Sequence, residues 1–463
     1  MSFTELTTTI SNTVWGWPMM ILLLGTHLFL TIRLKFPQRK LWTALRLSVR
    51  KDKQATGDVS QFTALATSLA ATIGTGNIVG VATAVSLGGP GAVLWCWLTG
   101  VFGIATKYSE GLLAIKYRVM TQRGQMLGGP MYALDRGLNM KWLAVLFCIF
   151  TAFAAFGIGN TVQANAISEN LSSTFCTGIE AGTMRIISGS VLVVCLAMTI
   201  IGGVKSIGRI CGTLVPLMAI CYVGGCVYIL IANSQYVLPA VKLIISEAFS
   251  FKASLGGAAG TAIMTAARYG IARGLFSNES GLGSAPIVAA AAQTRNPVRQ
   301  ALVSSTGTFW DTVIICALTG LVLVSSILAN PDIGFSDGGL ITKEAFSTIP
   351  VVGTPILSFG IITFAFSTIL GWCYYGERAV EYLSGRRCSI FTYRILFIIG
   401  SFFGSIMNLD TVWNIADIMN ALMAIPNLVS LLFLSGIVAK ETRHYLWDKN
   451  LDEDDEDKDL MKC

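Results

Sequence analysis

Charged residues are scarce in this chain of 463 residues. Asp, Glu, Lys and Arg together make up 13% of the sequence, whereas a soluble domain typically contains about 25%. Hydrophobic residues make up 53%, and the length allows roughly ten to twelve membrane-spanning helices of ~20 residues each. This composition excludes a soluble globular protein and predicts an all-α polytopic membrane protein.

Histidine is scarcer still, with only His27 and His444 in the whole chain. This argues against a histidine-based metal site or proton relay. The sequence also has no zinc-ligand set and no serine–histidine arrangement, and its glycine clusters lack the strand context of a phosphate-binding loop. The eleven cysteines show no metal-type pairing and are expected to be free thiols. We therefore expect neither an enzyme nor a nucleotide-driven pump, and no organic cofactor.

Eleven hydrophobic segments are long enough to span a membrane. The net charge of +7 does not indicate nucleic-acid binding, because the basic residues cluster between these segments. The positive-inside rule then predicts a multi-pass protein of a bacterial-type plasma membrane, with the amino terminus outside and the carboxyl terminus in the cytoplasm. The predicted spans are 14–32, 61–86, 91–117, 142–167, 184–203, 210–232, 258–293, 299–328, 352–382, 390–408 and 413–438.

The span 61–86 carries Gly74-Thr75-Gly76-Asn77 at its centre. Two glycines one residue apart weaken a helix where no water can satisfy the freed backbone groups. One interpretation is a packing face of small residues. The other is a broken helix whose freed N–H and carbonyl groups line a cavity and bind an anion and a cation.

The topology divides into two halves that favour the second interpretation. Without the first span, ten spans remain, and the five in 61–232 start from the opposite side of the membrane to the five in 258–438. This predicts an inverted repeat, and the first span of the second half is indeed interrupted, at 277–281 and Gly283. The predicted organisation is 1–60 (amino-terminal helix and basic cytoplasmic loop), 61–232 (first repeat), 233–257 (outer connector), 258–440 (second repeat) and 441–463 (acidic cytoplasmic tail, disordered over 452–459).

Several long motifs resemble the alanine or glycine:cation symporter family, also called sodium:alanine symporters. The resemblance covers nearly the whole chain and rests on SLAATIGTGNIVGVATAVSLGGPGAVLWCW (68–97), FGIGNTVQAN (156–165), RGLFSNESGLGSAP (273–286) and FAFSTILGWCYYGERAVEY (364–382). The departures, Leu94, Cys96 and Ser280, concern packing positions. The resemblance implies the LeuT-type fold of five plus five inverted helices, and sodium-coupled uptake of alanine or glycine by alternating access.

The first break is the predicted site for the substrate carboxylate. Thr75 and Gly76 can offer backbone N–H groups at the amino terminus of a half-helix. Gln163 is expected to reach the same ligand with its amide, although interhelical hydrogen bonding is an alternative role. Phe276 and Trp372 are candidate walls that limit side-chain size, or else packing residues.

Hard oxygen ligands suit sodium, and the resemblance implies where they lie. By motif position, a sodium site uses the hydroxyl groups of Ser367 and Thr368 with the carbonyls of Ala70, Ile73 and Phe364. The alternative is that the two hydroxyls bond their own preceding turn.

A second ion site and a buried carboxylate are less defined. We predict a possible second sodium at Asn77 and Ser277, together with the substrate carboxylate. Glu279, at the second break, could bind the substrate ammonium, join an ion site, or pair with Arg268 or Arg273.

Three further charged residues within spans, Asp311, Lys107 and Glu110, are interpreted as intramembrane pairs or helix-end anchors without a transport role. Open alternatives for the function are proton coupling through Glu279, glutamine as the substrate, and an ion channel, although no repeated filter is present. The expected partners are a small amino acid and the lipid bilayer. The oligomeric state is not predicted.

Overall fold

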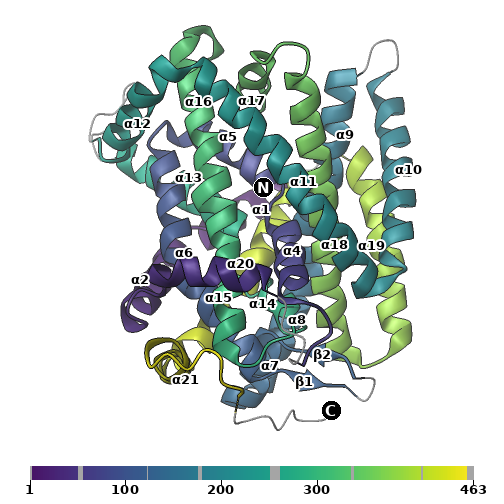
Figure 1. Ribbon diagram of the computed structural model, residues 1–463. Coiled ribbons are helices and arrows are strands. Elements are labelled where there is room, and N and C mark those ends of the chain that lie inside the picture. Colours follow the sequence, from purple (N-terminus) through teal and green to yellow (C-terminus); the bar gives the residue numbers. More distant parts are fainter. Residues whose placement is uncertain are drawn as a thin grey trace.

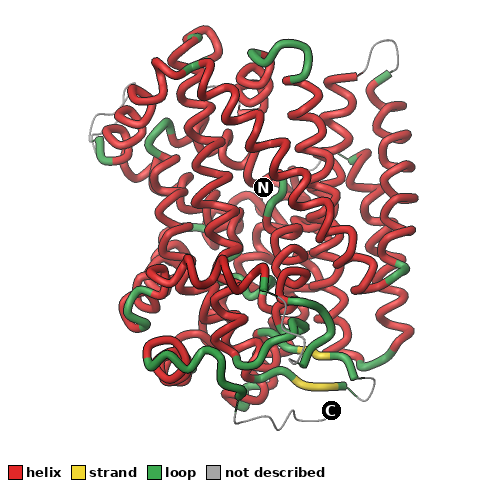
Figure 2. Tube along the Cα trace, in the orientation of Figure 1, coloured by secondary structure: helices red, strands yellow, loops and turns green. Residues whose placement is uncertain are grey.

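A computed structural model describes residues 3–50, 56–121, 124–175, 180–250, 261–334, 338–407 and 410–455. Long helices run side by side through the molecule (Figure 1), and the described part contains one two-stranded sheet at one end (Figure 2). The region before the first break consists of α1 (Phe3–Val14), α2 (Trp17–Arg33), η1 (Pro37–Lys40) and α3 (Leu41–Val49). The predicted all-α class is therefore confirmed.

The first half of the repeat contains most of the short connecting elements. Its elements are α4 (Gln61–Thr72), η2 (Gly76–Gly80), α5 (Val81–Gly88), α6 (Ala92–Lys116), β1 (Val119–Met120), β2 (Met126–Leu127), α7 (Pro130–Tyr132), η3 (Ala133–Gly137), α8 (Lys141–Phe156), η4 (Gly157–Thr161), α9 (Val162–Phe175), α10 (Ala181–Ile200) and α11 (Gly203–Ala232). In the predicted connector, α12 (Ser234–Ala248) is helical, and 251–257 lie outside the described residues.

The second half has the same plan of long helices. Its elements are α13 (Thr261–Asn278), α14 (Pro286–Ala289), α15 (Pro297–Thr308), η5 (Phe309–Cys316), α16 (Ala317–Ala329), η6 (Pro331–Ile333), α17 (Gly338–Ser347), α18 (Gly353–Ser384), α19 (Arg387–Ile406), α20 (Asp410–Phe433), α21 (Ser435–Glu441) and η7 (Thr442–Trp447).

Eight helices in the described part are long and apolar enough to cross a membrane, and the number is nine if the bent pair 61–72 and 76–88 is one span. The two predicted spans outside this set correspond to α6 and to α13–α14. Charged residues lower the hydropathy of both, and the second is interrupted. The count of eleven therefore stays a prediction. The first span begins at Glu5, earlier than predicted, because α1 and α2 together form it.

Both predicted helix breaks are present. The first half-helix ends at Thr72, Ile73 has an extended backbone, and the two halves meet at an angle of 52°. The second break starts after α13 at Asn278, where Glu279 has a φ of 54°, in the left-handed region that side chains rarely adopt. Pro286 then begins α14, where its missing N–H costs nothing.

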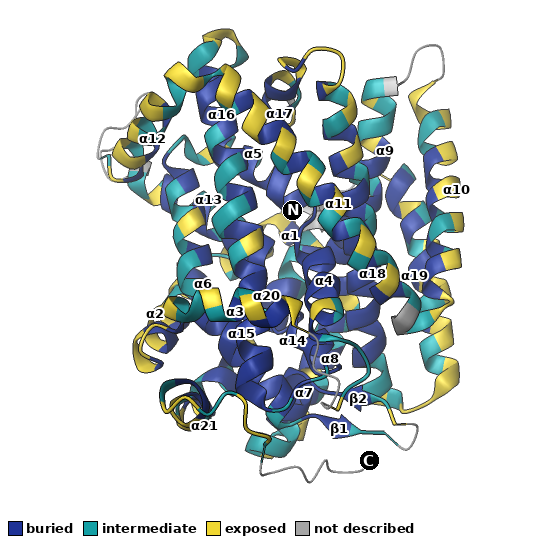
Figure 3. Ribbon diagram, in the orientation of Figure 1, coloured by how far each residue is buried: buried dark blue, intermediate teal, exposed yellow. Residues whose placement is uncertain are grey.

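The broken helices lie inside the bundle. α4 packs against α11 and α18, and α13 packs against α5 and α6. Figure 3 shows the consequence: exposed residues concentrate on peripheral helices such as α10, α12 and α19, whereas α4, α6 and α18 are largely buried. Both breaks are thus shielded from the surface that contacts lipid.

The end of the chain is more ordered than predicted. Residues 442–447 form η7, and the Asp452 carboxylate lies 2.6 Å from the guanidinium of Arg299, which is 1% exposed. The amide of Asp455 donates to the carbonyl of Arg295 at 3.0 Å. Basic groups at the start of α15 therefore order part of the acidic segment predicted to be disordered, and 456–463 lie outside the described residues.

Candidate substrate and ion site

A cluster of hydroxyl and carbonyl oxygens joins the middle of α18 to the first break. The Ser367 hydroxyl donates to the carbonyls of Ala70 at 3.2 Å and Phe364 at 2.9 Å. The Thr368 hydroxyl lies 3.2 Å from the carbonyl of Ala70 and 3.4 Å from that of Ile73. All five residues predicted for the first sodium site thus meet at one point. Their oxygens are neutral and hard, as an alkali cation requires.

Gly74 makes this approach possible. A Cβ atom at this position would lie 2.6 Å from the Thr368 hydroxyl oxygen and 3.5 Å from the side-chain oxygen of Gln163. Any side chain would therefore displace Thr368 of α18 from the break, while the contact with Gln163 of α9 would be an ordinary one. Farther along, Gly371 of α18 lies directly against Ala71, so the two helices stay in close contact.

The amide side chain of Gln163 reaches the same break from α9. Its oxygen accepts hydrogen bonds from the backbone N–H of Thr75 at 3.4 Å and from the Thr75 hydroxyl at 3.1 Å. Its nitrogen donates to the carbonyl of Ile158 at 3.1 Å, which fixes the orientation of the amide. The Gln163 oxygen is therefore the hydrogen-bond acceptor of the Thr75 N–H group, which is predicted to bind a substrate carboxylate.

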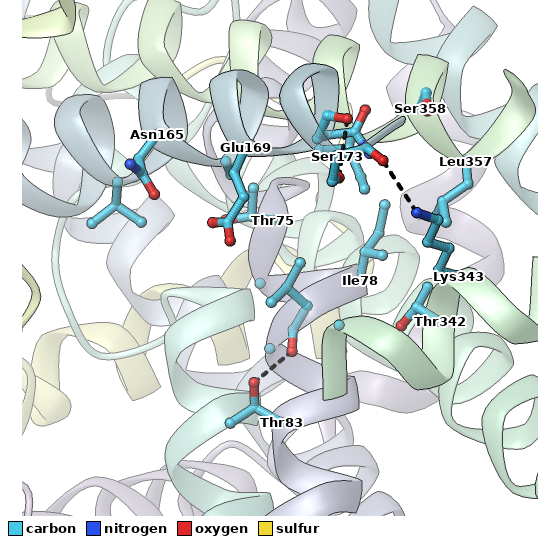
Figure 4. A pocket seen from close by; sticks show the side chains of 18 of the residues that line it. Thr75, Ile78, Thr83, Asn165, Glu169, Ser173, Thr342, Lys343, Leu357 and Ser358 are labelled. Atoms are coloured by element: carbon cyan, nitrogen blue, oxygen red, sulfur yellow. Dashed lines mark hydrogen bonds between the residues drawn. The ribbon is translucent and has the colours of Figure 1, made fainter. Parts of the chain in front are cut away.

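A cavity of about 590 Å³ opens beside the first break. Figure 4 shows its lining, which includes Asn165 and Glu169 from α9, Thr75 and Ile78 from the first break, and Leu357 and Ser358 from α18. This volume lies within the range of roughly 300–1,000 Å³ typical of small-molecule sites. Of the predicted substrate residues, Thr75, Gly76 and Phe276 line it.

Phe276 closes the cavity toward the second half. A Cβ atom on Gly76 would lie 3.1 Å from the Phe276 ring, so the ring rests on the first break. The Arg273 guanidinium lies 6.0 Å from the centre of the same ring, and Arg273 also lines the cavity. The aromatic wall predicted at this position is geometrically possible.

Trp372 and Glu279 do not line this cavity. The Trp372 side chain is 1% exposed, packs against the backbone of Gly159 and contacts the Tyr375 ring edge-on. The Glu279 carboxylate accepts a hydrogen bond from the Ser284 hydroxyl at 2.5 Å.

The predicted pairing of Glu279 with Arg268 or Arg273 is wrong. Arg268 donates to the side chain of Asn12, and Arg273 lies over Phe276 and interacts with Asp417. Both arginines therefore have partners other than Glu279.

Asn77 and Ser277 meet at a carboxylate that the sequence analysis did not assign to the site. The Asn77 amide donates to one oxygen of Asp311 at 2.7 Å, and the Ser277 hydroxyl donates to the other at 2.9 Å. The Thr312 hydroxyl also donates to the second oxygen, at 2.6 Å. Asp311 is 0% exposed, and the donors around it are neutral. The missed signal was a lone carboxylate in the middle of an apolar span.

Lys107 and Glu110 bind the backbone of the second break. The Lys107 ammonium donates to the carbonyl of Asn278 at 2.8 Å. One oxygen of Glu110 accepts the backbone N–H groups of Gly281 at 3.0 Å and Gly283 at 3.1 Å, and the amide of Asn427 at 2.7 Å. The two residues are therefore not a simple intramembrane pair. Their spacing on one face of α6 was the available signal.

Backbone contacts join the segments that flank the two broken helices. The segment before α4 pairs with the segment after α14 through bridges from Thr56 to Thr294 and from Val59 to Ala292. Arg118 donates to the carbonyl of Ala292 at 3.0 Å and to that of Thr56 at 3.3 Å. Burial lowers the pKa of Arg118 to about 10, so the guanidinium that binds the two carbonyls stays charged at neutral pH.

Two helices broken inside a bundle of membrane-spanning helices, with a cavity at one break, are the architecture of a membrane transporter. The fold of this chain is that of MhsT in complex with L-phenylalanine, which is 13% identical with a TM-score of 0.60 and covers 85% of this chain and 95% of that chain. The protein therefore has the LeuT-type fold.

The chain belongs to the sodium:alanine symporter family, whose model matches residues 1–459. The sodium/alanine symporter AgcS of Methanococcus maripaludis is 50% identical over 453 residues, or 96% of this chain and 98% of that protein. The probable sodium/glutamine symporter GlnT of Bacillus subtilis is 33% identical over 447 residues, or 96% of this chain and 91% of that protein. The predicted family is confirmed.

Proposed function

We propose that this protein is a secondary active symporter that takes up a small neutral amino acid, alanine or glycine, together with sodium by alternating access. The observation that carries the proposal is the meeting of the Ser367 and Thr368 hydroxyls with the carbonyls of Ala70 and Ile73 at the first break. The similarity to a sodium/alanine symporter supports the choice of ion and substrate.

The first sodium ion binds among the hydroxyl and carbonyl oxygens that link α18 to the break. A bound cation takes the place of the two hydroxyl hydrogens as the partner of the carbonyl oxygens. The hydroxyl oxygens coordinate it as well, so it draws α18 and α4 together. Because Gly74 lies between this cluster and Gln163, ion binding acts directly on the backbone that receives the substrate. Sodium thereby prepares the site for the amino acid.

The substrate carboxylate binds the backbone N–H groups of Thr75 and Gly76. To do so it displaces the Gln163 oxygen from Thr75, where that oxygen now acts as a stand-in acceptor. The freed amide then binds the substrate through its oxygen or nitrogen. Phe276 limits the side chain, and Trp372 contributes to this wall in the closed state.

A second cation binds at Asn77 and Ser277, and Asp311 supplies its negative charge. Three buried carboxylates, Glu110, Glu279 and Asp311, all interact with the single ammonium of Lys107. If all are ionised, this group carries an excess of negative charge, which is expensive in a bilayer. Transported cations, sodium first and protons as the alternative, neutralise it.

The cavity opens to the outside of a bacterial-type cytoplasmic membrane. Basic loops adjoin β1, β2 and α7, at the end of the molecule opposite to α12 and α17 (Figure 1). The positive-inside rule places that basic end in the cytoplasm, with the amino terminus outside. The structure then corresponds to a state that accepts ligands from outside, with the inner path closed at Arg118.

The test is uptake of radiolabelled alanine into liposomes that contain the purified protein, with an inward sodium gradient or an equal potassium gradient. We expect saturable accumulation only with sodium. The double variant Ser367→Ala, Thr368→Ala should lose this uptake. Equal uptake in both gradients contradicts sodium coupling.

Matched controls lie on the same helix. The hydroxyls of Thr363 and Ser384 bond the carbonyls of their own preceding turns, at 2.6 Å and 2.9 Å. The double variant Thr363→Ala, Ser384→Ala should therefore keep its sodium-dependent uptake. Competition by unlabelled glycine and glutamine decides the substrate. In a glutamine symporter, unlabelled glutamine would inhibit the uptake of labelled alanine more strongly than glycine does.

A further inference from the structure

The second break is held by a charged side chain that lies deep in the molecule. Lys107 is 1% exposed, and its ammonium lies 2.8 Å from the carbonyl of Asn278, the last residue of α13. A positive charge at the carboxyl end of a helix interacts favourably with the free carbonyls there. At the first break, the corresponding carbonyls of Ala70 and Ile73 have only neutral hydroxyl partners.

Lys107 and Asp311 stand on the long helical segments that follow the two breaks, Lys107 in α6 and Asp311 in η5. Each reaches the break of the other half, and Asp311 also accepts a hydrogen bond from Ser277 of its own half. The segment after the first break thus carries a cation, and the segment after the second carries an anion.

We propose that Lys107 is a built-in cation, a positioning residue that permanently holds the second break as transported sodium transiently holds the first. The comparison with sodium rests on the proposed function. The Asp311 carboxylate needs a cation from solution to neutralise its charge. The Asn278 carbonyl already has a cation beside it, the ammonium of Lys107, which is part of α6. Sodium-dependent rearrangement is therefore confined to the first break and Ser277, and the backbone from Asn278 to Gly283 keeps its conformation.

Glu110 completes this fixed unit. It stands one helical turn after Lys107 and accepts the N–H groups of Gly281 and Gly283, which face the opposite direction from the carbonyl of Asn278. Lys107 therefore binds a freed carbonyl of the second break and Glu110 binds two of its freed N–H groups, and both side chains come from α6. α6, α13 and α14 consequently move as one body during transport.

Hydrogen–deuterium exchange of the purified full-length protein, measured in sodium chloride and in potassium chloride of equal concentration, tests this without relying on transport. In the wild type, sodium should slow exchange of the amides in 72–78 and leave those in 278–285 unchanged. Slowing of both segments by sodium overturns the proposal. If sodium slows neither, the sodium coupling proposed above fails, and the variants below still decide the role of Lys107.

The variants are Lys107→Met, which keeps the length of the side chain, and Lys116→Met as the control on the same helix. Exchange in 278–285 should become about tenfold faster in Lys107→Met, the change expected from losing one charged hydrogen bond. It should be unchanged in Lys116→Met, because Lys116 pairs with Glu441 at the helix end, 3.1 Å away. Unchanged exchange in Lys107→Met overturns the proposal.

Chemical rescue provides a second arm should Lys107→Met fold poorly. In Lys107→Ala, ethylammonium chloride can fill the vacated space with the same head group. It should restore slow exchange in 278–285, whereas equal potassium chloride should not. Slow exchange in this variant without any added amine overturns the role of Lys107 as a cation.

Discussion

The two helix breaks share a topology and differ in chemistry. The freed backbone groups of the first have neutral hydroxyl and amide partners, from Ser367, Thr368 and Gln163, and this break opens onto a cavity. The carboxylate beside it, Asp311, bonds the side chain of Asn77 and not the backbone amides. The second is bound by the charged side chains of Lys107 and Glu110. In a bilayer, freed backbone groups must find partners inside the protein or in a bound ligand. The comparison teaches that freed backbone groups can be satisfied in two ways, by neutral groups that leave room for the proposed ion or by charged side chains that are part of the chain.

Glycine serves a different purpose at each break. Gly74 has no positive φ, and it is needed for the room that lets Thr368 approach. Gly281 and Gly283 have φ values of 90° and 84°, which L side chains rarely adopt. The first break therefore depends on space and the second on backbone conformation, and each dependence can be tested.

The largest effect is expected from removing the charge near the first break. Asp311→Asn keeps the shape of the side chain and removes the anion that Asn77 and Ser277 surround. Uptake should fall by at least about 100-fold, since loss of one partner from a buried charge pair costs roughly 3–5 kcal/mol. Initial rates of sodium-driven alanine uptake in liposomes provide the measurement.

The exposed Asp332 in η6 offers a control for this substitution. Asp332→Asn should keep the wild-type rate. If Asp311→Asn also keeps the wild-type uptake rate and sodium dependence, Asp311 does not supply charge to a transported cation. The proposed contrast between a cation from solution at the first break and Lys107 at the second would then be wrong.

The next effect separates space from conformation. Gly74→Ala should raise the half-saturating sodium concentration about thirtyfold, because overpacking typically costs about 2 kcal/mol and 1.4 kcal/mol is a factor of ten. The folded yield should be nearly normal. Gly283→Ala should instead lower the folded yield in size-exclusion chromatography, because its Cβ atom would lie 2.7 Å from Pro130 in a strained backbone. A normal sodium dependence of Gly74→Ala would contradict the proposed ion site.

A smaller effect is expected for the amide at the first break. Gln163→Ala should raise the KM for alanine about tenfold, the value of one or two hydrogen bonds at a buried site. The half-saturating sodium concentration should change less, because Gln163 contacts Thr75 and not the sodium cluster. If the half-saturating sodium concentration changed more than the KM for alanine, Gln163 would be assigned to the ion site and not to the substrate site.

The fold, and the contact between the residues predicted for the first ion site, could be predicted because their signals are local; that an ion binds there stays a prediction. Each break is marked by glycines within one hydrophobic span, and the positions of Ser367 and Thr368 follow from one motif. The exact number of spans could not be fixed, because α6 carries Lys107 and Glu110 and is thereby less hydrophobic than the other helices.

The contacts between the halves could not be predicted in the same way. Asp311 and Lys107 each bind a break more than 170 residues away, and only the packing of η5 against η2 and of α6 against α13 reveals this. Likewise, the sequence placed Trp372 beside the break, but whether an aromatic ring faces a cavity or the neighbouring backbone of Gly159 depends on the helix rotation.

The smallest effect comes from comparing one substitution at both breaks. Ser284 donates a single hydrogen bond to Glu279, whereas Ser367 bridges two carbonyls in the ion cluster. Ser284→Ala should change the uptake rate by no more than about fivefold, since a neutral donor contributes about 1 kcal/mol or less. Its sodium dependence should match that of the wild type, while Ser367→Ala should require more sodium. Sodium titrations at several pH values provide the check, because a pH profile displaced by Ser284→Ala would instead implicate Glu279 in proton transport and make the second break, too, a site of exchange with solution.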